Sequence, residues 1–353
     1  MKAIFPITAL LLTPLAGAEP MQRTLEPAAA KSVVQHLIAD LDVYIFPEKA
    51  NVLRAFLLQH LDAYQATTTP EALAAKLTSD MRAVANDKHL AVFYNAQPSP
   101  GEASASRPDN QNMHRVEEAR GFGIQSVARL PGNVGLIDIR YFSDDPEAFA
   151  AMDGAMGLLR GSDALIIDLR RNMGGHPDMV ERLLTYFFAD QVQLTSIVWR
   201  EAGMERTDEQ WTLVYVPGER FARTPVFVLT SASTFSAGEQ FAYDLKTLHR
   251  ATLIGHATGG GANPAPATQP LGAGFDAFIP TGRAFNPITK TNWEGVGVQP
   301  DVETKFADAL LEAYKRALKA AKPAVSEVRL DRTRERAISD PAQALRDAGL
   351  MSH

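Results

Sequence analysis

The sequence predicts an α/β (α+β) fold, in which a mixed domain of helices and strands follows a small N-terminal helical bundle. From residue 121 onward, short apolar runs rich in β-branched residues alternate with amphipathic stretches. This alternation is typical of buried strands connected by helices, with parallel pairing at the centre of the sheet. Before it, residues 27–84 repeat apolar side chains at helical spacing. Apolar residues make up 46 % of the 353 residues, which excludes a disordered chain.

The first 18 residues have the pattern of a secretory signal peptide. Lys2 gives a positive start, an apolar run extends to Leu15, and residues 16–18 are the small residues of a cleavage site. We therefore expect export to the periplasm or beyond the cell, with a mature chain that starts near Glu19. A membrane span needs about 20 apolar residues. The mature chain has no such run, so we expect no stable membrane span in it.

Charge and cysteine content exclude several classes of function. The 35 basic residues against 41 acidic residues leave a mildly negative chain, which is unlike the basic footprint of a nucleic-acid-binding protein. The chain has no cysteine, which excludes disulfides, a thiolate nucleophile and thiolate metal ligands. Neither an H-E-x-x-H motif nor a phosphate-binding Walker loop is present. We therefore predict no metal and no cofactor, and nothing in the sequence indicates an oligomeric state.

Segments rich in Pro, Gly and Ser, together with changes in the hydrophobic pattern, predict how the chain divides into domains. The predicted parts are a signal peptide (1–18), an N-terminal helical domain (19–97), a polar linker (98–120), a core domain (121–306), and a C-terminal helix with a charged tail (307–353). The core strands are predicted at residues 133–142, 164–170, 195–200, 212–216, 226–230 and 251–255.

A serine follows one of these strands at the point where a helix is predicted to begin. The strand 226–230 leads into a turn of small residues, and the helix starts at or near Ser236. The first turn of a helix has unpaired backbone N–H groups and the positive end of the helix dipole, which suit a nucleophile and a developing oxyanion. Ser236 and Glu239 also match the S-x-x-E capping box, so the same serine fits a purely structural cap.

A second strand-to-helix turn contains paired glycines. The buried strand 164–169 ends before Gly174 and Gly175, and a helix is predicted from about Pro177. Glycines allow backbone amides to approach a ligand closely, and ligands of α/β sheets bind beyond the carboxyl ends of the strands. This turn is a candidate for a second oxyanion donor, or a tight turn that only needs positive φ.

A catalytic serine needs a base. Composition and periodicity leave His89, His176 and His256 as candidates and do not choose among them. Glu294, in a glycine-rich segment, is the candidate for the acidic group behind the base.

Four segments in order resemble the C-terminal processing, or tail-specific, serine peptidases. They are NDKHL (86–90), DALIIDLRRNMGG (163–175), VFVLTSASTFSAGEQFAYDL (226–245) and WEGVGVQPDV (293–302). The similarity is strongest to the branch that contains the tricorn core protease and the modules of interphotoreceptor retinoid-binding protein. It covers essentially the whole mature chain and implies a core of the ClpP/crotonase type that hydrolyses peptides or proteins.

The resemblance also implies roles for individual residues. Ser236 matches the family nucleophile, and the backbone amide after it belongs to Ala237. Gly174 and Gly175 match the glycine pair of the oxyanion hole. His89 matches the base of the tricorn-like branch, and Glu294 matches the glutamate that completes its relay.

This sequence departs from the family pattern at three points. The branch that uses a Ser-Lys dyad has its lysine where Gly261 stands, which favours the histidine mechanism. Lys88 occupies a position where the tricorn-like relay has a serine, and a charged lysine accepts no hydrogen bond, so the coupling of Glu294 to His89 is left open. No segment resembles the PDZ domain with which many relatives bind substrate C-termini. The alternative function is a non-catalytic carrier of apolar ligands, such as retinoids or fatty acids, on the same fold.

Overall fold

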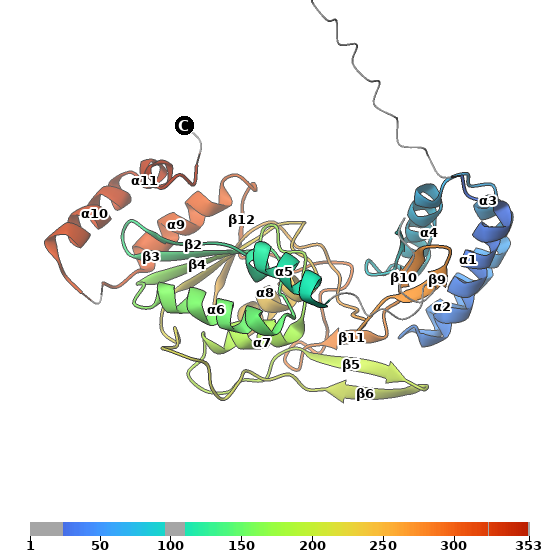
Figure 1. Ribbon diagram of the computed structural model, residues 1–353. Coiled ribbons are helices and arrows are strands. Elements are labelled where there is room, and N and C mark those ends of the chain that lie inside the picture. The colour runs from blue at the N-terminus through green and yellow to red at the C-terminus, as the bar shows by residue number, and fades with distance from the viewer. Residues whose placement is uncertain (1–23, 96–109, 324, 352–353) are drawn as a thin grey trace, which may run out of the picture.

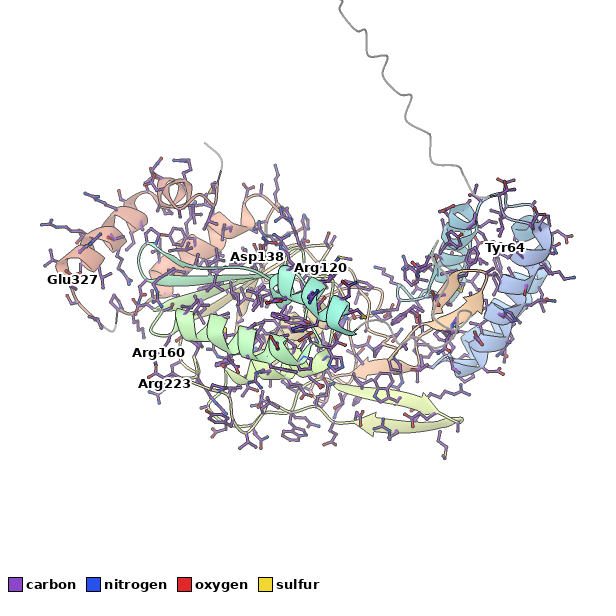
Figure 2. All side chains as sticks on the ribbon, viewed as in Figure 1. Tyr64, Arg120, Asp138, Arg160, Arg223 and Glu327 are labelled. Atoms are coloured by element: carbon purple, nitrogen blue, oxygen red, sulfur yellow. The ribbon has the colours of Figure 1, made fainter. Side chains whose placement is uncertain are left out.

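The computed structural model describes residues 24–95, 110–323 and 325–351, so the predicted signal peptide and the first part of the predicted linker lie outside the described residues. Figure 1 shows a helical domain at one end, a central sheet between helices, and a group of C-terminal helices at the other end. The labelled side chains Tyr64 and Glu327 mark the two ends (Figure 2). Within the described ranges, no helix has both the length and the apolar composition of a membrane span.

The main helices of the helical domain begin at prolines. It consists of α1 (Pro27–Asp40), η1 (Leu41–Val43), α2 (Pro47–Gln59), α3 (Leu61–Gln65) and α4 (Pro70–Ala85). Proline presets the helical φ and lacks the N–H that a first turn leaves unpaired, so it starts a helix at little cost. Thr69 caps α4 by accepting from the N–H of Ala72, and Asn86 ends it in the left-handed conformation, φ +48°. The chain then turns toward the core domain.

A small sheet completes the helical domain with residues from late in the chain. β1 (Ala91–Tyr94) pairs antiparallel with β10 (Phe275–Phe278), which pairs with β9 (Gln269–Gly272). Leu271 and Phe275 are buried in the same cluster as the helix residues Leu37 and Leu77. The predicted helical bundle is therefore present, and a hairpin from the core domain contributes part of its hydrophobic core. Figure 1 shows β9 and β10 beside the helices of this domain.

The core domain is built on a six-stranded sheet, which confirms the predicted fold class. The strand order is β12 (Val302–Glu303), β8 (Thr252–Gly255), β7 (Val226–Thr230), β4 (Ala164–Asp168), β3 (Val134–Ile139) and β2 (Ile124–Leu130). All neighbours pair in parallel except β2 and β3. Ile167 packs in the cluster of one face, whereas Ile166 packs in the cluster of the other. Burial on both faces explains why the strands are continuous apolar runs.

Helices cover both faces of this sheet. The first layer consists of α6 (Pro146–Leu159), α7 (Pro177–Thr185) and α8 (Ala237–Thr247). On the other face lies α9 (Ala309–Ala320), which α10 (Val328–Ser339) and α11 (Pro341–Asp347) contact. A separate antiparallel sheet, β11 (Gly282–Phe285), β5 (Ser196–Glu201) and β6 (Met204–Asp208), extends beneath the helical domain (Figure 1).

Two local expectations differ from the structure. Residues 212–216, predicted to form a strand, are irregular, and Val214 and Tyr215 are exposed, so the apolar side chains there do not pack in a sheet. The segment predicted to be a linker contains α5 (Asn110–Ala119), followed by η2 (Gly121–Gly123). Glu117 of α5 accepts hydrogen bonds from Tyr141 and Ser143, contacts with a distant segment that local composition does not reveal.

Candidate active site

The two strand-to-helix turns singled out in the sequence meet at one edge of the sheet. β4 and β7 are parallel neighbours, so the segments that follow them leave the same edge. The N–H of Phe235 donates to the carbonyl of Asn172 over 2.9 Å. A Cβ added to Gly174 would lie 2.7 Å from the Cβ of Ser236. Only glycine allows the two turns to approach this closely, because any side chain at 174 would push them apart.

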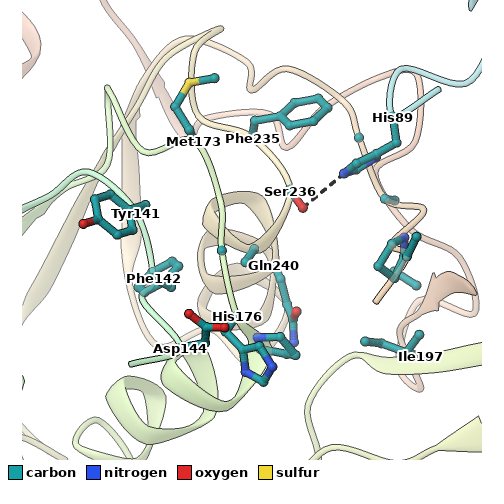
Figure 3. A pocket seen from close by; sticks show the side chains of 18 of the residues that line it. His89, Tyr141, Phe142, Asp144, Met173, His176, Ile197, Phe235, Ser236 and Gln240 are labelled. Atoms are coloured by element: carbon teal, nitrogen blue, oxygen red, sulfur yellow. Dashed lines mark hydrogen bonds between the residues drawn. The ribbon is translucent and has the colours of Figure 1, made fainter. Parts of the chain in front are cut away.

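Ser236 is the N-cap of α8 and has an unusual backbone conformation. Its φ is +52° and its ψ is −120°, a region that non-glycine residues rarely adopt. Strain of this kind costs about 1–3 kcal/mol and is concentrated at functional sites. The N–H of Ser236 donates to the Glu239 carboxylate over 2.9 Å, so the turn is fixed from within the helix. Its hydroxyl points into a cavity (Figure 3).

Of the three candidate histidines, the structure brings His89 to this hydroxyl. His89 Nε2 lies 3.1 Å from Ser236 Oγ (Figure 3). The His89 ring packs against Phe235 and Phe278, with ring centroids 4.7 Å and 5.8 Å away. His176 lines the same cavity but is exposed and caps α7. His256 is also exposed, and its closest charged partner is Glu303, 3.6 Å away.

Glu294 is coupled to the His89 loop through the backbone of Lys88. One carboxylate oxygen of Glu294 accepts from the N–H of Lys88 over 3.3 Å, and the other accepts from the N–H of Ala262 over 2.6 Å. The Lys88 side chain instead donates to the carbonyl of Gly259. The contact of Glu294 with this loop therefore does not depend on the side chain at position 88, because it uses an amide that every residue except proline has.

Burial sets the protonation of the groups around His89. It lowers the pKa of His89 to about 4, with a further contribution from Arg82. It raises the pKa of Glu294 to about 7, and the nearby charge of Asp87 adds to this effect. A buried site disfavours the charged form of each group. Titratable groups that lie close together and have oppositely shifted pKa values are typical of a site that transfers protons.

The described residues contain one set of acidic and histidine side chains with the spacing of metal ligands. Donor atoms of Asp87, His89 and Glu294 lie within 4.8 Å of one another. Both carboxylates already accept hydrogen bonds from protein groups, and Nε2 of His89 faces the serine. The carboxylate oxygens are therefore engaged by protein donors, whereas Nδ1 of His89 is buried and has no hydrogen-bond partner among the described residues.

The backbone amides near Ser236 differ in their availability. The N–H of Gly174 donates to the Asn172 side chain over 2.9 Å. The N–H groups of Gly175 and Ala237 make no hydrogen bond to any other described residue. Gly175 has φ +130°, and a Cβ there would lie 2.0 Å from the carbonyl oxygen of Phe142. Two unpaired donors therefore flank the serine.

Gly261 lies against the histidine ring. A Cβ at this position would be 2.7 Å from Cε1 of His89 and 2.2 Å from Cζ of Phe235. In the peptidases that use a Ser-Lys dyad, the catalytic lysine stands at the position that matches Gly261. Here the imidazole occupies the space that a side chain would need, so a lysine at 261 and His89 in its present place exclude each other.

Sequence reasoning treated Glu239 only as a capping residue, and the structure gives it more contacts. Its carboxylate is fully buried and accepts from the N–H groups of Ser236, Gly260 and Gly261 and from the hydroxyl of Thr258. It thereby connects the backbone of Ser236 to the glycine segment that contacts His89. The S-x-x-E spacing pointed to the bond between Glu239 and Ser236, but it did not reveal the donors of the distant segment 258–261.

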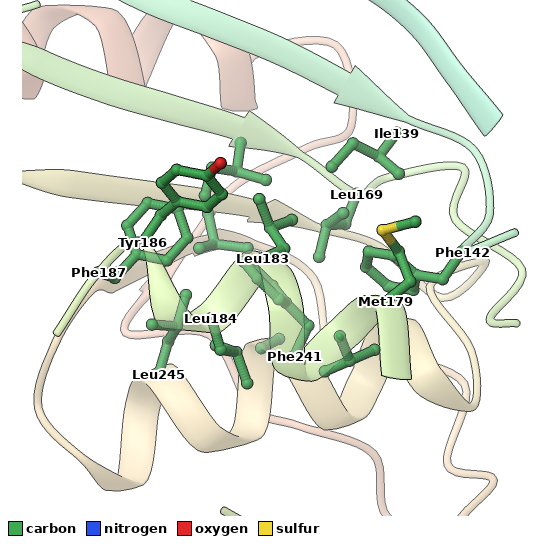
Figure 4. Packing of buried hydrophobic residues seen from close by; sticks show 14 of the residues in the cluster. Ile139, Phe142, Leu169, Met179, Leu183, Leu184, Tyr186, Phe187, Phe241 and Leu245 are labelled. Carbon is green, nitrogen blue, oxygen red and sulfur yellow. The ribbon is translucent and has the colours of Figure 1, made fainter. Parts of the chain in front are cut away.

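Hydrophobic packing holds the helix that begins at Ser236. Phe241 and Leu245 of α8 pack with Leu183 and Leu184 of α7 (Figure 4). All four side chains are fully buried. Such a core is close-packed and resists displacement, so the N-terminus of α8 has a fixed position relative to the sheet.

The cavity beside Ser236 has a volume of about 650 Å³ and mostly apolar walls. Its larger apolar lining residues are Tyr141, Phe142, Met173, Ile197, Trp199, Phe235, Phe278 and Trp293. Its polar lining residues, besides Ser236 and His89, are Glu117, Ser143, Asp144, His176 and Gln240. Neither lysine nor arginine is among the described residues that line it.

Comparisons with known proteins agree with this architecture. The chain is similar in structure to a putative peptidase from Parabacteroides merdae ATCC 43184, with a TM-score of 0.56 and 18 % identity over 86 % of this chain and 100 % of that one. It is also similar to a lipoprotein from Streptococcus agalactiae, with a TM-score of 0.55 and 15 % identity over 88 % of this chain and 99 % of the other. At these identities the likeness shows the fold alone.

Two protein-family models match the sequence. The model of peptidase family S41 matches residues 133–304, and the model of the N-terminal domain of Peptidase_S41 in eukaryotic IRBP matches residues 26–121. Together they cover well over half of the 353 residues, including all the described residues that line the cavity. The chain therefore belongs to peptidase family S41 and is a serine-type peptidase.

Proposed function

We propose that this protein is an exported serine endopeptidase that hydrolyses peptide bonds through an acyl-enzyme on Ser236, with His89 as the general base. The observation that carries the proposal is the 3.1 Å approach of His89 Nε2 to Ser236 Oγ at the wall of a large cavity. This distance is within the range for proton transfer. Export rests on the signal-peptide pattern of residues 1–18.

In the first half of the reaction, His89 takes the proton of the Ser236 hydroxyl as Oγ attacks the peptide carbonyl. The carbonyl oxygen becomes an oxyanion, which the N–H groups of Ala237 and Gly175 stabilise. We assign the second donor to Gly175 rather than Gly174, because the N–H of Gly174 already bonds to Asn172. Each donor of this kind contributes about 2.7–4 kcal/mol to catalysis.

In the second half, His89 gives its proton to the leaving amine, and the C–N bond breaks. Water then enters, His89 accepts a proton from it, and the hydroxide attacks the acyl-enzyme. Collapse of this second oxyanion releases the acid and restores the Ser236 hydroxyl with the proton from His89. The Glu294 carboxylate offsets the positive charge that His89 has in both steps.

The walls of the cavity favour internal peptide bonds over a free C-terminus. A free C-terminal carboxylate needs a cationic side chain or an equivalent set of donors to offset its charge. Neither Lys nor Arg contributes to the described lining, whereas Glu117 and Asp144 do. The apolar side chains around the serine instead suit the side chains of an uncharged peptide segment.

A fluorophosphonate probe tests the proposal directly. The activated hydroxyl is expected to attack phosphorus, and peptide mapping by mass spectrometry should place the adduct on Ser236. The Ser236→Ala protein serves as the matched control and should remain unlabelled. No adduct on the folded wild-type protein, together with tight binding of retinoid or fatty acid, would overturn the proposal in favour of a carrier.

The pH dependence of kcat/KM should follow Glu294. Burial raises the pKa of Glu294 to about 7. Below this pH the side chain is neutral and cannot offset the charge on His89, so kcat/KM should rise as the pH rises through about 7 and then level. Glu294→Gln should lower kcat by about 10²–10⁴-fold, since it removes the carboxylate behind the base. It should also remove the rising limb near pH 7.

Glu181→Gln is the control for this pH profile. Burial also raises the pKa of Glu181 to about 7, but this residue lies on α7 and does not line the cavity. The variant should keep both the activity and the limb. A Glu294→Gln enzyme that retains the rise near pH 7 would show that another group causes it.

A further inference from the structure

We propose that Asp87 is a positioning residue for the reaction, because its buried carboxylate joins the helical domain to the core domain and thereby holds His89 at the distance from Ser236 that proton transfer needs. This inference rests on the proposed function, in which His89 is the base. Asp87 does not contact the reacting atoms, and it acts through the backbone of the loop that carries the histidine.

Three hydrogen bonds converge on this carboxylate. Oδ2 of Asp87 accepts from the hydroxyl of Tyr44 over 2.8 Å and from the side-chain amide of Asn263 over 2.9 Å. Oδ1 accepts from the backbone N–H of His89 over 3.0 Å. Asp87 and Tyr44 are 0 % exposed and Asn263 is 1 % exposed. The cluster therefore has no access to water that could replace a lost bond.

The three donors come from three different parts of the chain. Tyr44 lies between η1 and α2 in the helical domain, and His89 follows α4. Asn263 belongs to the core segment in which the N–H of Ala262 bonds to Glu294 and Gly261 touches the His89 ring. The carboxylate therefore connects the loop of the base to both domains at once. A change in any of the bonds alters where the imidazole stands relative to the serine.

Other contacts at the domain junction explain why the loss of one bond should not separate the domains. The N–H of Ile45 donates to the carbonyl of Pro280, and Arg200 donates to the carbonyls of Asp42 and Tyr44. The hairpin β9–β10 is also packed in the core of the helical domain. The bonds to Asp87 thus adjust the position of one loop within an interface that other contacts maintain.

Only a carboxylate satisfies all three donors. Both of its oxygens accept, whereas an asparagine in this place would turn an N–H₂ group toward at least one donor. A buried carboxylate is retained only where hydrogen bonds offset the cost of its desolvation. Burial raises the pKa of Asp87, and the hydrogen bonds from Tyr44, His89 and Asn263 oppose that effect.

The decisive comparison is between Tyr44→Phe and Tyr64→Phe. Both residues are fully buried tyrosines of the helical domain, and each donates to an aspartate over 2.8 Å, to Asp87 and Asp80 respectively. Tyr64 lies near the outer end of the helical domain (Figure 2) and does not line the cavity. The two substitutions are the same chemical change, but Asp80 is partly exposed and Asp87 is fully buried, so the free energy of unfolding is measured for each variant.

We expect Tyr44→Phe to lower kcat for a peptide substrate by about 10–100-fold with KM within about twofold of wild type, because a misplacement of about 1 Å in a catalytic group has effects of this size. The rate constant for fluorophosphonate labelling of Ser236 should fall by a similar factor. Tyr64→Phe should leave both rates within about twofold. Asn263→Ala, which removes a donor from the core side, should reproduce the loss in kcat even if Tyr44→Phe does not fold.

Equal kcat values for Tyr44→Phe, Asn263→Ala and Tyr64→Phe in folded proteins would overturn the positioning role. A loss confined to KM would also overturn it, since it would indicate an effect on substrate binding. Failure of the proposed function would look different: the wild-type protein itself would not be labelled at Ser236. If the wild type is active and labelled but the Tyr44 and Asn263 variants keep the wild-type kcat, the positioning role is wrong and the proposed function still stands.

Discussion

A Ser236→Ala variant is expected to lose peptide hydrolysis by about 10⁴–10⁶ in kcat, the loss that removal of the nucleophile causes in serine peptidases. The remaining amides of Gly175 and Ala237 can still polarise a bound carbonyl, but no group in the cavity then forms the covalent intermediate. The measurement is kcat with a peptide substrate, together with labelling by a fluorophosphonate. Both signals should disappear together.

The folding of this variant must be measured separately, because Ser236 is also the N-cap of α8. Its backbone N–H bonds to the carboxylate of Glu239, and this bond survives the substitution. The free energy of unfolding should therefore change by no more than about 1 kcal/mol. Ser233→Ala provides a control from the same turn, since Ser233 is exposed and does not line the cavity, and it should keep full activity. Turnover by a folded Ser236→Ala protein would contradict the assignment.

Local sequence patterns were sufficient to locate the two strand-to-helix turns that meet at the edge of the sheet. The strands that precede Gly174 and Ser236 are continuous apolar runs, and each is followed by small residues and a helix. Parallel neighbours leave the same edge of a sheet, so these two turns were expected to face one ligand. The choice among His89, His176 and His256 came from the family resemblance, because a histidine has the same local signature whether it caps a helix or accepts a proton.

Local sequence patterns did not predict the contacts between segments that are distant in the chain. The sequence left open how Glu294 is coupled to His89, because Lys88 replaces a serine. In the structure Glu294 accepts from the backbone N–H of Lys88, a contact that no side-chain motif encodes. The preference for Gly175 over Gly174 depends on the orientation of the Asn172 side chain. The hairpin β9–β10 joins the helical domain from more than 180 residues away, a pairing that hydrophobic periodicity does not reveal. The bonds of Asp87 to Tyr44 and Asn263 have the same nonlocal character.

The second large effect is expected for His89→Ala, which should lower kcat by about 10⁴–10⁶, as loss of the base does in comparable sites. The reason is geometric: His89 is the histidine within hydrogen-bond distance of Ser236 Oγ in the described residues, and the hydroxyl is a poor nucleophile without it. Since burial already keeps His89 neutral, by lowering its pKa to about 4, its removal takes away a base that is available throughout the neutral range.

The matched comparisons are His176→Ala and His256→Ala. His176 caps α7 at the cavity wall, so its loss should change KM more than kcat, with kcat within about tenfold of wild type. His256 is exposed beside Glu303, and its loss should change neither constant. An inactive His176→Ala enzyme beside an active His89→Ala enzyme would move the base to α7. Such a result would also remove the reason for the Asp87 contacts, because the loop that they hold would then carry no reacting group.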